Sequence, residues 1–279
     1  MALENGYREL TDGRRQVRFA LYVTIGVIVF GELMGALIVR ALGDPADADL
    51  NLPRWALLLS TLLFLVPLVL VLRRRAMPLA STLRIRAVAP VVLRDALFIG
   101  LGISVLIDEL DRLLASIIPM PAAIAEGMNF LAFSTSTEAL LVIGGAVLVA
   151  PLLEELVFRG FLQGQLEAGY RDATKAVLIS AVVFMLLHLN PWWALQIYLL
   201  GVVLGYLAWR TGSIWPPFLV HATNNGLATW FANRSETGAD WYTLGGHVAP
   251  QWLLVAAILA YAGFRSLNSQ GRLVTVGES

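Results

Sequence analysis

The sequence predicts an all-α, polytopic membrane protein of about eight transmembrane helices with interfacial helices. Two observations carry this prediction. The mean hydropathy is +0.72, and 58% of the residues are hydrophobic while only 14% are charged. Several apolar runs also approach the ~20 residues that a helix needs to cross a bilayer. A soluble chain of 279 residues would not contain so many runs of this length.

Two classes of site are excluded by composition. The formal net charge is zero, so nothing indicates a nucleic-acid partner. The chain contains no cysteine, which excludes disulfides and thiolate metal ligands. The expected environment is therefore a lipid bilayer, and the oligomeric state is not predicted.

The apolar runs define eight expected spans within a single membrane domain, residues 1–279, that ends in a polar tail at residues 266–279. Two connecting segments, residues 79–90 and 108–133, are expected to lie along opposite membrane surfaces, the first as an amphipathic helix. The expected spans are residues 17–39, 55–72, 91–107, 138–158, 174–189, 192–209, 213–231 and 249–264.

Basic residues are distributed unequally between the two sides of these spans. With the N-terminus in the cytosol, the other side keeps only Arg40, Arg54, Arg112 and Arg234 of the 20 Lys and Arg residues. This bias follows the positive-inside rule and favours both termini in the cytosol. The expected location is the inner or plasma membrane of a cell.

A charged motif follows the fourth apolar run, in Pro151-Leu-Leu-Glu-Glu-Leu-Val-Phe-Arg-Gly-Phe-Leu-Gln163. An ionisable residue within a membrane span is by default a candidate functional residue. Glu155 and Arg159 are four residues apart, so on a helix they share a face and can form an ion pair. Glu154 and Arg159 lie roughly 140° apart around the helix. We therefore expect Glu154 to face a different surface, which must be polar, wet or catalytic.

Two of the three histidines lie within expected spans. His188 ends Phe184-Met-Leu-Leu-His188, and His221 opens His221-Ala-Thr-Asn-Asn225. Each histidine alone is as compatible with a structural role as with a functional one. Together with Glu154, Glu155 and Asn225 they favour one shared polar cavity. His247 is expected in a solvated loop.

Other notable residues are expected to be structural. Glu32 in the first span is more compatible with packing or pairing than with catalysis, and lining an access path is an alternative. Phe184 is expected to pack. The pairs Gly144-Gly145 and Gly201-x-x-x-Gly205 are expected to let helices approach closely.

The three motifs, in this order, resemble those of the CPBP intramembrane proteases. They are Glu154-Glu155-x-x-x-Arg159, Phe184-x-x-x-His188 and His221-x-x-x-Asn225. That family includes the CAAX prenyl proteases (Ras-converting enzymes) and bacterial proteins linked to bacteriocin immunity and processing. The resemblance implies a catalytic core at residues 138–232 and leaves the first three spans and the last one unassigned.

The resemblance also implies roles for the motif residues. Glu154 matches the general base that activates water, and Glu155 with Arg159 matches the accompanying pair. His188 matches the second-motif histidine, and His221 with Asn225 matches the third-motif pair, whose side chains suit oxyanion stabilisation. Glu154, His188 and His221 could also hold Zn²⁺ with an open position for water. The zinc signature His-Glu-x-x-His is absent, so a metal-free mechanism is equally compatible with these residues.

The expected function is that of an intramembrane endopeptidase, a CAAX-type peptidase that hydrolyses a peptide or membrane-protein substrate with glutamate-activated water. Metal dependence is left open. Two rivals share the same residues: a non-catalytic immunity or scaffold protein of this fold, and a proton-coupled transporter. Neither the substrate nor its prenylation follows from the sequence.

Overall fold

The computed structural model describes residues 2–42, 51–121, 131–234 and 240–270, and this part of the chain is nearly all-α. The only strands in these ranges are two-residue strands, β1 (Thr243–Leu244) and β2 (His247–Val248), which pair antiparallel. The prediction of an all-α protein is confirmed. Among the described residues, five helices are long and apolar enough to cross a membrane, so the predicted count of eight spans is not confirmed.

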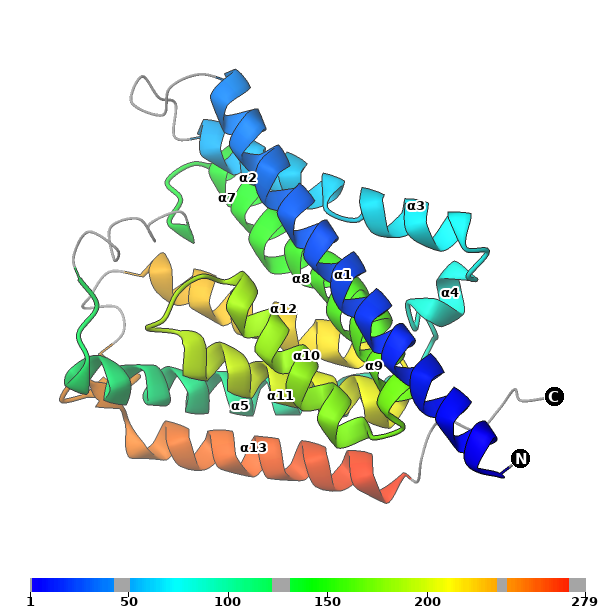
Figure 1. Ribbon diagram of the computed structural model, residues 1–279. Helices are drawn as coiled ribbons and strands as arrows, with labels where there is room; N and C mark the ends of the chain where they lie inside the picture. Colours follow the sequence, from blue (N-terminus) through cyan, green and yellow to red (C-terminus); the bar gives the residue numbers. More distant parts are fainter. Residues whose placement is uncertain (1, 43–50, 122–130, 235–239, 271–279) are drawn as a thin grey trace.

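The five long apolar helices account for most of the expected spans. In chain order they cover Asp12–Ala41, Pro90–Ile117, Ser136–Tyr170, Ala194–Thr211 and Pro250–Ser269. They correspond to most of α1 (Ala2–Leu42), to α5 (Pro90–Ile117), to one continuous helix over residues 136–170, to α11 (Ala194–Thr211) and to α13 (Pro250–Ser269). In Figure 1, α1 crosses in front of the helix over residues 136–170, and α5 and α13 lie side by side.

The second expected span, residues 55–72, is two short helices, α2 (Asn51–Leu63) and α3 (Val66–Arg74). Pro67 follows the break, and a proline cannot donate the backbone hydrogen bond that would continue the helix through this point. Helices of 13 and 9 residues are about 20 and 14 Å long, short of the ~30 Å hydrocarbon core. Figure 1 shows that α3 leaves α2 at an angle.

Two more expected spans, residues 174–189 and 213–231, are helices that are not long and apolar enough to count as membrane-spanning. α10 (Ala173–Leu187) has only 15 residues, and α12 (Trp215–Ala232) has 18 but is not among the five long apolar helices. α12 carries His221, Asn224 and Asn225, which lower its hydropathy. These two helices carry the second and third motifs.

The segment over residues 79–90 is not an interfacial helix. Only α4 (Leu79–Thr82) is helical, and Arg84 adopts a left-handed backbone conformation with φ 54°. The remainder turns inward. The carbonyl of Arg84 accepts from the backbone of Ile214, and the carbonyl of Arg86 accepts from the Ser213 hydroxyl. The segment is thus held against the start of α12.

Two further boundaries also differ from expectation. α5 continues to Ile117, so the first ten residues of the segment expected along the surface, 108–117, extend a helix instead. Residues 122–130 of that segment lie outside the described ranges. α13 continues to Ser269, so the expected polar tail begins as helix, and residues 271–279 are not described.

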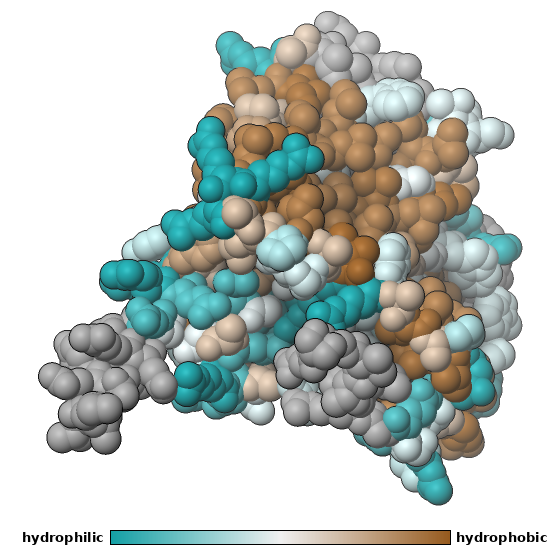
Figure 2. Space-filling model, turned by 90° about the vertical axis from the view of Figure 1, so that its right-hand side faces the viewer, coloured by the Kyte–Doolittle hydropathy of each residue, from teal (hydrophilic) through white to brown (hydrophobic). Residues whose placement is uncertain are grey.

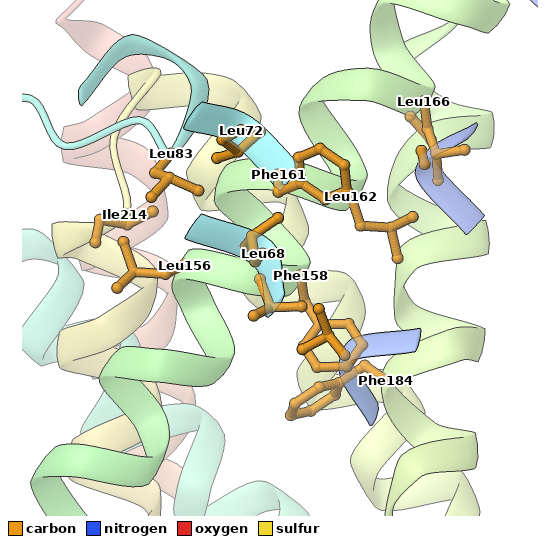
Figure 3. Packing of buried hydrophobic residues seen from close by; sticks show 14 of the residues in the cluster. Leu68, Leu72, Leu83, Leu156, Phe158, Phe161, Leu162, Leu166, Phe184 and Ile214 are labelled. Atoms are coloured by element: carbon orange, nitrogen blue, oxygen red, sulfur yellow. The ribbon is translucent and has the colours of Figure 1, made fainter. Parts of the chain in front are cut away.

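The helices pack in two clusters of buried apolar side chains. One joins α5, α11 and α12 with the end of α13, and the other joins α1, α3, α10 and the helix over residues 136–170. Figure 3 shows the second cluster, in which Leu68, Leu72, Phe158 and Phe161 interlock. Between helices in lipid, such packing contributes van der Waals contact rather than removal of apolar surface from water. Figure 2 shows a broad hydrophobic region on one face, with hydrophilic residues gathered below it.

Candidate active site

The first motif lies in the middle of the continuous helix over residues 136–170. This helix consists of α7 (Ser136–Val142), the π-helical segment η3 (Ile143–Val149), α8 (Ala150–Glu155), a second π-helical segment η4 (Leu156–Leu162) and α9 (Gln163–Tyr170). Glu154 and Glu155 end the α-helical turns between the two π-helical segments. π-helical turns are rare and frequently occur at functional sites.

The two adjacent carboxylates have different surroundings. The side chain of Glu155 is fully buried, and that of Glu154 is 21% exposed and lines a cavity. The expected separation of Glu154 from the Glu155–Arg159 face is confirmed by this difference in burial.

Glu155 and Arg159 form the expected ion pair. Nη1 of Arg159 donates to Oε1 of Glu155 over 3.0 Å, and both side chains are fully buried. Nη2 of Arg159 donates to the backbone carbonyl of Gly201 on α11. A Cβ atom on Gly201 would lie 3.1 Å from that of Ala181 on α10, so this glycine allows the close approach that was expected. The predicted span ended at residue 158, whereas the structure places Arg159 well inside a longer helix.

His221 connects the two glutamates. Its Nδ1 lies 3.0 Å from Oε1 of Glu155, and its Nε2 lies 3.9 Å from Oε2 of Glu154. A carboxylate only accepts hydrogen bonds, so Nδ1 carries the proton and donates it to Glu155. In a neutral imidazole, Nε2 then presents its lone pair toward Glu154. The helix positions predicted that Glu154 and Glu155 face different surfaces, and this imidazole reaches both.

His188 lies at the C-terminal end of α10, where its Nδ1 is 2.9 Å from the backbone carbonyl of Phe184. Nδ1 therefore carries the proton here too, and Nε2 is left for other partners. His188 lines the same cavity as Glu154. One polar cavity was expected for both histidines with Glu154, Glu155 and Asn225. Glu154 and His188 do line it together, whereas Glu155, His221 and Asn225 are not among its lining residues, so the expectation is confirmed for two of the five.

The expected spans placed Glu154 and His188 near opposite membrane surfaces, and the structure corrects this. Glu154 lies 16 residues before the end of α9 at Tyr170, and His188 lies 15 residues after the start of α10 at Ala173. The chain therefore runs away from Glu154 and returns by almost the same distance, since both segments are helical. The predicted end of the fourth span at residue 158 was wrong.

Phe184 is enclosed by the charged and imidazole groups. Its ring lies under the Arg159 guanidinium, with 4.1 Å between Cζ and the ring centroid. It also meets the rings of His188 and His221 edge to face, at centroid distances of 4.8 and 5.6 Å. The side chain is 1% exposed, so the expected packing role is confirmed. Such a cation–π contact offsets part of the cost of burying Arg159.

Asn225 lies one turn beyond His221 on α12. Its Nδ2 donates to the backbone carbonyl of Ala146 in η3 over 2.9 Å. An amide nitrogen carries two hydrogens, so one remains for another acceptor. The amide is oriented by the same helix that carries Glu154.

The cavity has a volume of about 590 Å³ and lies between four helices. Glu154 and His188 line one side, and Ser60, Thr61 and Phe64 line another. Ala150 and Leu187 lie on the side of Glu154 and His188, and α1 supplies the remaining wall, namely Gly31, Glu32, Gly35, Ala36 and Val39. Sequence reasoning did not assign this wall; its one signal was the carboxylate of Glu32 within an apolar run.

The donor atoms needed for Zn²⁺ do not converge. Within the described ranges, no group of three His, Asp or Glu side chains could hold a metal ion. The imidazole orientations alone would suit ligands, since Nδ1 of each is fixed and Nε2 is left over. Because these two Nε2 atoms do not converge with the Glu154 carboxylate, the residues present do not fit Zn²⁺.

His247 is the third histidine, and it is not simply solvated. Its Nδ1 pairs with Oε1 of Glu109 on α5 over 2.9 Å, although its side chain is 44% exposed. The neighbouring Tyr242 hydroxyl donates to Asp108. Burial, reinforced by the Asp108 carboxylate, raises the pKa of Tyr242 above its usual value. These contacts fasten the β-hairpin to α5, away from the motif residues.

Residues 136–227 match the family model described as type II CAAX prenyl endopeptidase Rce1-like. This match confirms, over these residues, the resemblance predicted from the three motifs. The match covers all six motif residues and leaves α1, α2, α3, α5 and α13 outside it. Comparisons with curated proteins and with solved structures gave no match. The Rce1-like segment supports a CAAX-type intramembrane endopeptidase in general, and the apolar helices support an integral membrane protein.

Proposed function

We propose that the protein is an endopeptidase that hydrolyses a peptide bond of a membrane-associated or peptide substrate, with Glu154 as the general base. One observation carries the proposal: of the two adjacent glutamates, only Glu154 lines the cavity and lies beside Nε2 of His221. Glu155 is committed to Arg159 and His221 and has no exposure. It positions the imidazole rather than reaching the substrate.

The first step is activation of water. The gap of 3.9 Å between Oε2 of Glu154 and Nε2 of His221 suits a water molecule at about 2.8 Å from each, bound at an angle. Such a water donates one hydrogen to the carboxylate and the other to the imidazole lone pair. Glu154 removes a proton as the oxygen attacks the carbonyl carbon of the substrate.

The second step is stabilisation of the oxyanion on the tetrahedral intermediate. The remaining N–H of Asn225 is the neutral donor for this role, because Ala146 fixes the other. His188 donates a second hydrogen bond to the oxyanion only as an imidazolium, because its Nδ1 proton is bound to the Phe184 carbonyl and Nε2 needs a proton of its own. A donor fixed in advance needs no reorganisation during the reaction.

The third step is cleavage. The C–N bond breaks, and protonated Glu154 returns its proton to the amine nitrogen of the leaving group. The products are a carboxylate, which contains the oxygen of the water, and a free amine. Glu154 ends as a carboxylate and can activate the next water.

The expected placement in the membrane is part of the proposal. We infer a single membrane domain with residues 138–232 as catalytic core, both termini cytosolic, in an inner or plasma membrane. The first turns of α1 and the last turn of α13 lie at the same end of the molecule in Figure 1, which supports placing both termini on one side.

The direct test uses purified protein in liposomes with a panel of membrane peptides, prenylated and unprenylated, in water enriched in ¹⁸O. We expect one ¹⁸O atom in the new carboxyl group after a single turnover. Prenyl dependence is read from the same panel. Cleavage that persists after chelation, with no stoichiometric zinc by elemental analysis, supports the metal-free mechanism; loss of cleavage restored by zinc contradicts it.

Two other outcomes distinguish the rival functions. Proton-coupled uptake of a solute into the liposomes without cleavage would favour a transporter. A cellular phenotype that survives Glu154→Gln would favour an immunity or scaffold protein.

A further inference from the structure

The wall of the cavity that α1 supplies contains a carboxylate, Glu32, outside the Rce1-like segment. Glu32 lines the same cavity as Glu154 and His188. A volume of about 590 Å³ is within the range of ligand sites and can hold several side chains of a peptide. α1 approaches closely at this depth, since a Cβ on Gly31 would lie 2.7 Å from the Phe64 ring.

The charges that face the cavity have one sign. Its lining includes two acidic residues, Glu32 and Glu154, and no lysine or arginine. The nearest motif cation, Arg159, is fully buried and bound to Glu155, so it does not line the cavity. A cavity with apolar walls and charges of one sign focuses its field, and this field attracts cations and repels anions.

Glu32 is also the less committed of the two acids. It forms no hydrogen bond or ion pair with any other residue of the described ranges, and its side chain is exposed. A carboxylate on a membrane helix is costly and normally pairs with a partner. In a protease cavity, the partner that arrives with the substrate is a basic side chain, because lysine and arginine are the cationic side chains of a peptide.

We propose that Glu32 is a specificity-determining residue that binds a lysine or arginine side chain of the substrate, within a few residues of the bond that is cleaved. This inference rests on the proposed function, because it assigns the second acid in the cavity to the same substrate on which Glu154 acts. Substrates with an acidic side chain at that position are disfavoured by both carboxylates.

The test compares three peptides that differ at one position: lysine, norleucine or glutamate. The position is moved residue by residue along both sides of the cleaved bond, and the amino terminus is acetylated so that it carries no charge. We expect one position at which lysine is preferred. At that position, Glu32→Gln should raise KM for the lysine peptide about tenfold, because one charge-assisted hydrogen bond is lost. KM for the norleucine peptide should not change.

Two further variants make the test specific. Asp12→Asn removes an acid from the same helix, 20 residues and so about 30 Å away from Glu32, and should leave the preference unchanged. Glu32→Lys should invert the preference toward the glutamate peptide, which a variant that is merely misfolded cannot do.

Three outcomes would overturn the proposal. If the preference for lysine is unaffected by Glu32→Gln, the Glu32 carboxylate does not bind the substrate and faces lipid instead. An equal fall in kcat for lysine and norleucine peptides would make Glu32 a proton carrier for Glu154. No preference at any position would also contradict it. This inference can be separated from the proposed function by measuring peptide binding with fluorescence anisotropy in the Glu154→Gln background. If the unmodified protein cleaves no peptide but the lysine peptide still binds more tightly, the proposed function fails while this inference stands.

Discussion

At the scale of single residues, the central feature is the difference between the surroundings of Glu154 and those of Glu155. Helical angles alone predicted that the two carboxylates face different surroundings. The angles could not predict that one imidazole reaches both, because this depends on the depth at which α12 packs against α8. His221 therefore joins a buried, charge-balanced pair to an accessible acid.

Asn225→Ala tests the oxyanion assignment. Removing one oxyanion donor costs about 10²–10³ in kcat in proteases, so we expect a fall of this size with KM little changed. Steady-state kinetics on a cleaved peptide measures both constants. Asn224→Ala is the control: its Nδ2 contacts Asn225 at 3.4 Å only, and we expect less than a tenth of the effect. Equal effects of the two substitutions would contradict the assignment.

Arg159→Met tests the buried ion pair as a structural element. Removing one partner leaves Glu155 as an uncompensated buried charge, so the free energy of unfolding should fall by about 3–5 kcal/mol. The same change at exposed Arg265, whose one hydrogen bond within the described ranges is to the Tyr261 hydroxyl, should cost less than about 1 kcal/mol. Reversible unfolding in mixed micelles measures both. A loss at Arg159 no larger than that at Arg265 would refute the account of this pair.

At the scale of elements, hydropathy located the helices but not their ends. The fourth span was expected to end at residue 158, because Gln163-Gly-Gln-Leu-Glu-Ala-Gly-Tyr170 is not apolar. The helix nevertheless continues to Tyr170, since Gln163 bonds to the Gly205 carbonyl of α11 and to Glu167. Hydropathy reports contact with lipid, whereas these turns are stabilised by polar contacts between helices. The π-helical segments have no signal in the sequence that we could identify.

The glycines show the same limit at a finer level. Gly144-Gly145 was expected to mark a close approach, yet among the described residues no neighbouring helix comes within 4 Å of the position of a Cβ on Gly144. A Cβ on Gly145 would meet Leu58 at 3.8 Å, an ordinary van der Waals contact. Gly102, which was not singled out, packs so closely on α13 that a Cβ would overlap with the Ala256 carbonyl oxygen. Which glycine lies at an interface depends on the partner helix.

These two glycines provide a prediction of opposite sign. Gly102→Ala should destabilise the protein by about 1–3 kcal/mol, because backbone atoms of α13 would have to move. Gly144→Ala should be neutral or stabilise by up to about 1 kcal/mol, because alanine favours helix and meets nothing. Thermal unfolding of the two variants side by side checks the signs. Destabilisation by both would contradict the packing described for α5 and α13.

At the scale of the whole molecule, the cavity is built from parts that the family motifs do not cover. α1 and α2 precede the Rce1-like segment, and their contribution could not be predicted because nothing in either sequence indicates which helix lies opposite Glu154. The proposed placement of both chain ends on one side of the membrane likewise concerns the whole fold. It can be tested directly because the chain has no cysteine.

Single cysteines should report this orientation without background labelling. We expect Asp12→Cys and Ser269→Cys to react with a membrane-impermeant maleimide only from the cytosolic side. Leu244→Cys, near the start of α13 and so about 30 Å from Ser269, should react only from the other side. Labelling of intact and broken spheroplasts distinguishes the cases. Residues 12 and 269 on opposite sides would contradict the proposed topology.

The measurement that tests the central claim most directly is cleavage by Glu154→Gln in liposomes, beside the same change at Glu109. Glutamine keeps the shape of the side chain but cannot take a proton from water, so we expect Glu154→Gln to lose at least about 10³ in kcat while its unfolding remains that of the unmodified protein. Glu109→Gln removes an acid of α5 that pairs with His247, and should retain cleavage. Cleavage by Glu154→Gln at an undiminished rate would contradict the assignment of Glu154 as the base.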